Sequence, residues 1–131
     1  MKILKFEDLP IWRLSLSITK KVYDLTSNNK LSRDFGLRDQ IRRAVVSISS
    51  NIVEGFEKSN NNEFIRYLKI AKGSLGEVRN QLYIALSISY ISQKEFDDVN
   101  LQLLNLASQI GGLTIYLIKN KSVIRNSKLK N

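Results

Sequence analysis

Large apolar residues recur at helical spacing along most of this chain of 131 residues. The clearest series runs from Phe64 to Ala85 in steps of four and three residues, and a second series runs from Phe96 to Leu117 in steps of three and four. Such spacing places the apolar side chains on one side of an α-helix and is typical of the seam of a helical bundle. No stretch shows the apolar–polar alternation of a β-strand, so the pattern predicts an all-α protein.

Two further apolar series predict helices in the first half of the chain. The first helix is expected to begin near Asp8 as its N-cap, with Pro10 in the first turn, and to end at residues 27–30. Its apolar residues form two stripes about 100° apart, which is wider than one core face requires. The second helix is expected to begin within residues 33–37 and to end within residues 56–59.

The third and fourth helices carry clear start signals. Asn60 and Ser92 are each followed three residues later by a glutamate, which is the spacing of a capping box. The third helix is expected to run to about Ile91. Because short connections make consecutive helices antiparallel neighbours, the chain is predicted to form one up-down-up-down antiparallel four-helix bundle over residues 1–120, followed by a short basic tail at residues 121–131.

Polar residues lie beside the apolar seam on the second and third helices, and in an antiparallel hairpin the two sets are expected to face each other. A buried carboxylate without a partner costs several kcal/mol. We therefore expect Glu77 to pair with Arg43 or Arg42, and Glu54 to accept hydrogen bonds from nearby donors. The predicted polar network comprises Gln40, Arg43, Ser47, Asn51, Glu54, Ser74, Glu77 and Gln81.

Three glycines fall inside the same two predicted helices, at Gly55, Gly73 and Gly76. Each costs about 1 kcal/mol relative to Ala in a helix interior, and the usual reason to keep one is close approach of two backbones. The network and its glycines have two interpretations. They could fix the register of the helices, or they could form a subunit junction or a ligand-facing pocket.

The formal net charge is +9, and the last thirteen residues contribute five basic side chains and no acid. Basic residues also cluster around the first connection, at Lys20, Lys21, Lys30, Arg33 and Arg38. Such clusters can contact phosphate groups, although a solvated surface has the same composition. The candidate nucleic-acid contacts are Arg66, Lys69, Lys72 and Arg79 on the third helix, with Lys119, Lys121 and Arg125 at the C-terminal end.

The chain contains neither Cys nor His. The commonest catalytic bases and nucleophiles and the softer metal ligands are therefore absent, and we expect no catalytic site, metal or cofactor. The Glu-x-x-His pairs of di-iron bundles cannot occur. No apolar run approaches the ~20 residues of a membrane span, and no signal-peptide core is present, which favours a cytoplasmic protein without a membrane partner.

Four motifs carry a family resemblance. They are Phe-x-x-Leu-x-x-Trp at residues 6–12, Gly-Leu-x-x-Gln-x-x-Arg-Ala at 36–44, Ser-Ile-Ser-Ser-Asn-Ile-Val-Glu-Gly at 47–55, and Ala-x-Gly-Ser-x-x-Glu at 71–77. Through them, residues 6–90 closely resemble the four-helix-bundle proteins of the 23S rRNA intervening-sequence family. Ser49 and Val53 stand where that family usually has proline and alanine, so any function tied to a proline kink is in doubt here.

The resemblance implies a bundle that assembles as a ring-shaped homopentamer. Related bundle proteins act as accessory factors in diversity-generating retroelements, where a basic pentamer binds a reverse transcriptase and nucleic acid. By analogy, and because of the basic clusters, the leading hypothesis is a non-enzymatic homo-oligomer that binds RNA or DNA without strong sequence specificity. The alternative is a protein-binding scaffold or adaptor that makes no direct contact with nucleic acid.

Overall fold

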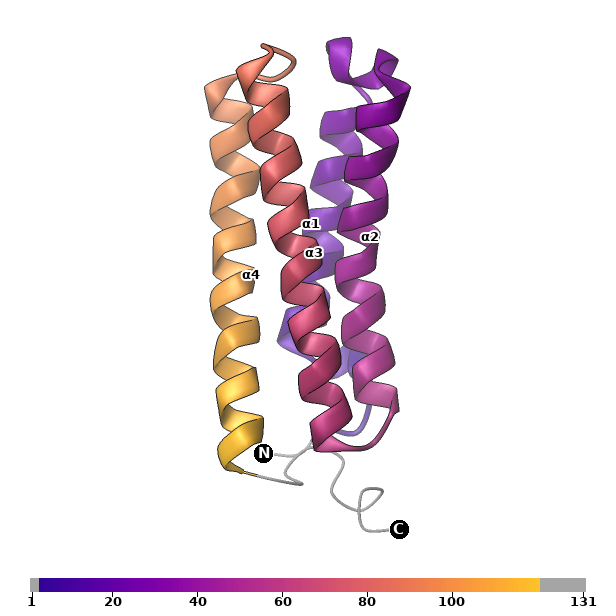
Figure 1. The fold of residues 1–131 in the computed structure, drawn as a ribbon, viewed down its shortest axis with the longest axis vertical. Helices are drawn as coiled ribbons and strands as arrows, with labels where there is room; N and C mark the ends of the chain where they lie inside the picture. The colour runs from indigo at the N-terminus through magenta and orange to yellow at the C-terminus, as the bar shows by residue number, and fades with distance from the viewer. Residues whose placement is uncertain (1–2, 121–131) are drawn as a thin grey trace.

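The computed structural model describes residues 3–120, and this part of the chain is all helical, with no strand. The all-α four-helix bundle predicted from the apolar spacing is confirmed. The basic tail predicted at residues 121–131 lies outside the described residues. Two short 3₁₀ helices accompany four α-helices, in the order η1 (Phe6–Asp8), α1 (Pro10–Thr26), η2 (Asn29–Arg33), α2 (Phe35–Glu57), α3 (Asn61–Ser87) and α4 (Gln93–Lys119) (Figure 1).

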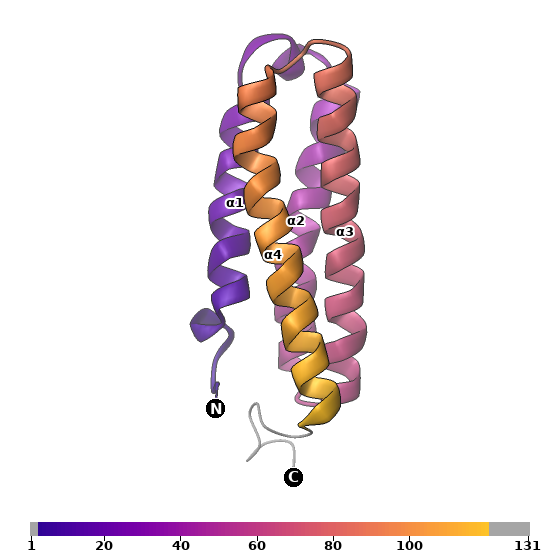
Figure 2. The same cartoon turned by 90° about the vertical axis from the view of Figure 1, so that its left-hand side faces the viewer.

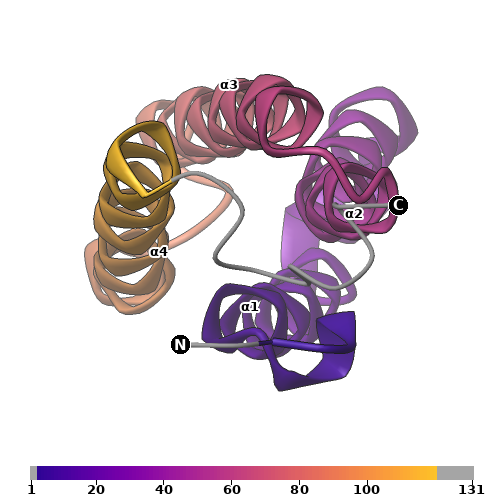
Figure 3. The same cartoon turned by 90° about the horizontal axis from the view of Figure 1, so that it is seen from below.

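The four helices lie side by side around one core. Each helix packs against the next one along the chain, and α4 also packs against α1, so the four helices surround a common centre when seen from below (Figure 3). The α1–α2 and α3–α4 connections lie together at one end of the bundle, and the α2–α3 connection lies at the other (Figures 1 and 2). Residues far apart in sequence therefore meet at the end that carries η2.

The core is built from the predicted apolar seams. All seven seam residues of α3 are buried, and so are six of the seven on α4, where Leu113 is half-buried. The two predicted stripes of α1 differ in burial. In one, Ile18 and Val22 are fully buried; in the other, Leu9 is buried and Trp12 packs against the core, whereas Leu16 and Tyr23 are 51% and 38% exposed. The later part of that second stripe is thus on the surface of the isolated bundle.

The start of α1 differs from the prediction. Asp8 is the last residue of η1 and does not cap α1; Leu9 is the N-cap, and no side chain bonds to the free N–H groups. The reason is Pro10 at the first helical position, because a proline ring forces the preceding residue into an extended conformation. Asp8 instead accepts a hydrogen bond of 3.4 Å from Arg13.

The other three helices begin as their side chains predict. Asp34 and Asn60 accept hydrogen bonds from the backbone N–H groups of Leu37 and Glu63, at 3.1 and 3.0 Å. Ser92 and the glutamate three residues later form a complete capping box at the start of α4. These bonds satisfy donors that have no partner within a helix.

Helix α3 ends at Ser87, four residues before the predicted end. Ser89 adopts a left-handed conformation with φ of 63°. The N–H groups of Ser89 and Tyr90 donate to the carbonyls of Leu86 and Ala85, at 3.0 and 2.8 Å. This is a Schellman ending, and it occurs without the glycine that usually marks one, which is why the sequence did not reveal it.

Helix α4 is apolar on average, although no continuous apolar run in it is long. Among the described helices it is the one whose length and composition would allow it to cross a membrane, with a mean hydropathy of 1.3 over eighteen residues, of which 22% are buried. Asn and Gln residues interrupt its apolar positions and mask this property in the sequence. In the bundle, one side of α4 lies in the core.

Candidate nucleic-acid interface

The four basic residues proposed on α3 have different surroundings. Lys69 and Lys72 are exposed and form no ion pair within residues 3–120. Arg66 is bound to Glu63 through two hydrogen bonds of 3.0 and 3.3 Å. Arg79 is half-buried and donates from Nε to Oδ1 of Asn100 on α4, at 2.8 Å. The two lysines are thus free to meet an anion, whereas both arginines already have partners.

The Arg66–Glu63 pair is held in place from two sides. The Arg66 guanidinium lies 4.5 Å from the centre of the Tyr67 ring, a cation–π contact. The hydrogen bond from Arg66 lowers the pKa of Glu63, and the same bond, with the contact to Tyr67, raises the pKa of Arg66. Both side chains therefore stay charged near neutral pH, and phosphate would have to compete with the Glu63 carboxylate.

The remaining candidates lie at or beyond the end of α4. Lys119 is exposed in the last turn of the helix, where a positive charge is favourable beside the free carbonyls. Lys121 and Arg125 lie outside the described residues. The described part of the candidate interface therefore consists of the α3 side chains and Lys119.

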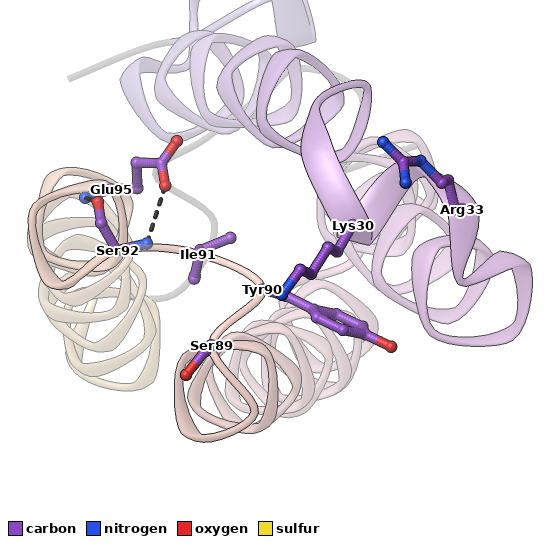
Figure 4. Close-up of a pocket in the computed structure, with 7 residues that line it drawn as sticks. All are labelled: Lys30, Arg33, Ser89, Tyr90, Ile91, Ser92 and Glu95. Carbon is purple, nitrogen blue, oxygen red and sulfur yellow. Dashed lines mark hydrogen bonds between the residues drawn. The ribbon is translucent and has the colours of Figure 1, made fainter.

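A second basic surface lies at the end of the bundle that carries η2. Lys30 and Arg33 line a hollow of about 480 Å³ together with Ser89, Tyr90, Ile91, Ser92 and Glu95 (Figure 4). Neither cation forms an ion pair with another described residue. The sequence placed these cations at the first connection, but nothing in it showed that the α3–α4 connection closes the other side of the hollow.

Tyr90 joins the two connections. Its hydroxyl donates to Oδ2 of Asp34, the N-cap of α2, at 3.0 Å. This hydrogen bond raises the pKa of Tyr90, because the protonated phenol is the form that donates. Phe35, next along the chain, is 65% exposed, and its ring lies 4.8 Å from the guanidinium of Arg38.

The predicted polar network forms in part. Ser47 and Ser74 share a hydrogen bond of 2.8 Å across α2 and α3. Asn51 donates from Nδ2 to the carbonyl and the hydroxyl oxygen of Ser47, at 2.8 and 3.0 Å. Glu54 accepts from the Tyr67 hydroxyl at 3.4 Å, so its predicted donor is a hydroxyl. These contacts fasten α2 to α3 on the outer side of the core, as a register device would.

The predicted ion pair of Glu77 with Arg43 or Arg42 is wrong. Glu77 and Arg43 are both exposed, so neither carries the cost of burial that would require a partner. Arg42 turns to α1, where it donates to Oγ1 of Thr26 at 2.8 Å and stacks on the Tyr23 ring at 4.5 Å.

Residues of the network also line a shallow hollow of about 470 Å³ between α2 and α3, which contains Gln40, Arg43, Ala44, Ser47, Glu77 and Gln81. Gln81 is 6% exposed, and its Oε1 is buried without a hydrogen-bond partner in the described part of the chain. Within residues 3–120 no group of three Asp, Glu, His or Cys side chains could hold a metal ion.

Of the three glycines, Gly55 alone lies at a close approach of helices. A Cβ atom built on it would lie 2.6 Å from Cβ of Tyr67 and 3.1 Å from Cδ1 of Phe64, both on α3. Gly73 and Gly76 have no such neighbour within 4 Å, so the prediction of close packing is wrong for them.

Comparison with known proteins places these features in a family. Residues 7–112 match the family model of the 23S rRNA-intervening sequence protein. A crystal structure of a protein of unknown function from the S23 ribosomal protein family of Bacteroides thetaiotaomicron has a TM-score of 0.67 and 26% sequence identity, over 84% of this chain and 99% of that one. No curated protein matches. The matched residues span α1, α2, α3 and most of α4, and the chain belongs to the 23S rRNA-intervening sequence protein family.

Proposed function

We propose that this protein is a non-enzymatic, cytoplasmic homo-oligomer that binds RNA or DNA through basic surfaces without strong sequence specificity. The observation that carries the proposal is that most of its Lys and Arg side chains within residues 3–120 form no ion pair. Of all the Lys and Arg side chains in residues 3–120, those of Arg13, Lys20, Arg38 and Arg66 alone form ion pairs. Unpaired surface cations gain free energy from phosphate by releasing condensed counterions.

Two pairs of free cations are suited to this role. Lys69 and Lys72 lie one turn apart on the outer side of α3. Lys30 and Arg33 line the hollow at the end of the bundle that carries η2. Lysine contacts phosphate as a point charge and reads no base edge. The expected binding is therefore weak, tolerant of sequence and strongly dependent on salt, and assembly into a homo-oligomer would strengthen it through avidity.

Charge reversal tests the proposal. We expect the double variant Lys69→Glu/Lys72→Glu to bind a fluorescent single-stranded RNA or a duplex DNA at least tenfold more weakly at low salt. The slope of log K against log salt should decrease by about one for each phosphate group that the variant no longer neutralises. Lys5→Glu/Lys94→Glu is the matched control, because it changes the net charge equally at two exposed lysines that belong to neither basic cluster. Equal reductions in affinity in both variants would show that net charge alone is at work.

The alternative is a protein scaffold, and one observation favours it. Leu16 and Tyr23 are exposed on α1 and line a largely apolar hollow with Thr19 and Lys20. A partner bound there would remain bound at high salt, unlike nucleic acid. Protein purified without nuclease and passed over a sizing column at low and high salt distinguishes the two. Nucleic acid that is retained at low salt and released at high salt supports the main proposal, and its absence at low salt supports the scaffold.

The native mass from the same column tests the oligomer. The family resemblance implies a homopentamer, and the exposed stripe of α1 is consistent with burial between subunits. A mass of about five chains supports a ring. A mass of one chain at all concentrations would contradict self-association.

A further inference from the structure

Helix α4 itself carries no charged side chain over twenty residues. No Asp, Glu, Lys or Arg occurs from Val99 to Ile118. Four large apolar side chains point outward in this stretch, Leu101, Leu104, Ile115 and Ile118, and they are 70%, 44%, 56% and 54% exposed. A long apolar stripe left in water is unfavourable and usually marks a contact surface.

The spacing of these four residues is symmetric about the middle of the helix. The midpoint lies between Gln109 and Ile110. Leu101 and Ile118 are equally far from it, and so are Leu104 and Ile115. The residues between them include four small ones, Ala107, Ser108, Gly111 and Gly112. A Cβ atom on Gly112 would have no neighbour within 4 Å, whereas Ala107 packs against the core and a Cβ atom on Gly111 would lie 4.0 Å from Nζ of Lys72 on α3.

A sequence of this kind is complementary to itself. If two copies of α4 cross antiparallel about a twofold axis, Leu101 lies opposite Ile118 of the other copy and Leu104 lies opposite Ile115, while the small residues meet at the centre. In such a contact the same surface is used by both copies, so complementarity requires this mirror spacing. Small central residues also let the two backbones approach closely, as they do where helices cross in membranes.

We infer that the outer face of α4 is a twofold self-association surface, on which a second copy of this chain packs its own α4 antiparallel. The inference deepens the proposed self-association and rests on it, because it names one face and its symmetry. A closed ring uses two different faces head to tail, so a twofold contact on α4 is separate from a ring contact. It would pair two chains or join two rings.

The size of the face sets the expected strength. The stretch from Leu101 to Ile118 is about 27 Å long at 1.5 Å per residue. With a helix about 10 Å wide, its outer face covers roughly 300 Å², less than the ~800 Å² per partner of a standard interface. We therefore expect a dissociation constant on the order of micromolar for this contact alone. Joining two rings would multiply the contact and tighten the assembly.

A second copy explains this face better than a lipid surface does. A helix that lies on a membrane has one polar, basic face and one apolar face. The inner side of α4 is part of the bundle core, and the amides of Asn105 and Gln109 lie exposed beside the outer stripe, joined by a hydrogen bond of 3.3 Å. That bond uses one donor of Gln109 and the oxygen of Asn105. The remaining amide groups can bond to a second protein chain, but they would have no partner in hydrocarbon.

The first test is native mass by sedimentation over a range of concentrations. The variant Leu104→Lys/Ile115→Lys should have half the mass of the unaltered protein at about ten micromolar. The variant Val46→Lys/Ile70→Lys changes two residues of similar exposure on α2 and α3, 40% and 42%, and should keep the full mass. Circular dichroism establishes that each variant is folded. An unchanged mass in the folded α4 variant would overturn the inference.

The second test depends on symmetry. The chain has no cysteine, so a single cysteine can be placed at will. Ser108 lies close to the proposed axis, and Ser108→Cys should form a disulfide-linked dimer on mild oxidation, whereas Ser87→Cys at the end of α3 should not. A head-to-tail ring contact pairs two different faces and does not by its symmetry place Ser108 opposite Ser108 of the neighbour. Failure of Ser108→Cys to crosslink above the dissociation constant would contradict the twofold axis.

The same variants separate this inference from nucleic-acid binding. Leu104→Lys/Ile115→Lys carries no substitution at a proposed phosphate contact, so a halved mass with RNA binding per chain still measurable supports the α4 surface. Loss of RNA binding in Lys69→Glu/Lys72→Glu at an unchanged native mass bears on the proposed function alone. Co-sedimentation of the unaltered protein with phosphatidylcholine–phosphatidylglycerol vesicles, abolished by the α4 substitutions, would show that lipid covers this face and would overturn the inference.

Discussion

Gly55 offers the sharpest test of the packing between α2 and α3. A Cβ atom at this position would lie 2.6 Å from Cβ of Tyr67, well inside van der Waals contact. That atom is attached directly to the α3 backbone, so no side-chain rotation can move it away. Gly55→Ala therefore requires α2 and α3 to separate by several tenths of an ångström along the seam that buries Phe56 and Phe64.

Two effects of opposite sign determine the result. Replacing Gly by Ala within a helix stabilises it by about 1 kcal/mol, because the unfolded chain loses freedom. Overpacking a tight contact typically costs about 1–3 kcal/mol. Since the clash is with an atom that cannot rotate away, we expect the cost to exceed the gain, and Gly55→Ala to lower the free energy of unfolding by about 1 kcal/mol.

Gly73 and Gly76 provide matched controls on α3. Neither has a neighbour within 4 Å of an added Cβ, so their alanine variants gain helix stability without the clash. We expect each to raise the free energy of unfolding by about 0.5–1 kcal/mol. Urea unfolding followed by circular dichroism at one fixed protein concentration measures all three variants. If Gly55→Ala proved as stable as Gly73→Ala, the close approach would not constrain these helices.

Three further changes test individual contacts. Tyr90→Phe removes the hydrogen bond to Asp34 and should lower the melting temperature at pH 7. Because that bond raises the pKa of Tyr90, its contribution to stability is complete below pH ~10 and is lost as pH rises through the pKa of the folded state. The melting curves of the two proteins should therefore converge at high pH. Gln81→Leu removes a buried acceptor that has no partner within residues 3–120 and should raise the free energy of unfolding by about 1 kcal/mol in urea; a decrease would mean that the amide is satisfied. Ser89→Gly relieves a φ of 63° at the end of α3 and should stabilise the fold by about 0.5–1 kcal/mol, measured in the same way, whereas destabilisation would argue against strain.

The elements that local chemistry determines were predictable from the sequence. Apolar spacing located all four helices and nearly all of the core, because burial of one stripe is what holds a helix in a bundle. The caps at Asn60 and Ser92 were predictable because each side chain accepts a hydrogen bond from the backbone N–H three residues later in the chain. The start of α1 was not, since Pro10 overrides a favourable cap at Asp8. The end of α3 was not, because a serine occupies the left-handed position.

The polar network shows where periodicity stops being informative. The contacts Ser47–Ser74 and Glu54–Tyr67 join residues whose numbers sum to 121, three more than a turn centred at Ser59 predicts. The right helices therefore face each other, but displaced by nearly one turn. At the observed register Glu77 lies level with Ala44, one position from Arg43, so the displacement does not account for the missing ion pair. Both side chains are exposed and line the same hollow, where water can solvate each charge.

The same limit applies to the candidate interface, where residue type decides more than position. Arg66 and Arg79 donate hydrogen bonds to neighbouring side chains, those of Glu63 and Asn100, because a guanidinium group has five N–H donors in one plane. Lys69 and Lys72, on the same helix, form no ion pair within residues 3–120. We therefore expect the lysines to make the phosphate contacts. Lys69→Gln/Lys72→Gln should weaken RNA binding in fluorescence anisotropy several-fold more than Arg66→Gln/Arg79→Gln, although both remove two charges. Equal reductions in affinity would show that the observed partners of the arginines give way readily to phosphate, and that the whole basic side of α3 acts as one surface.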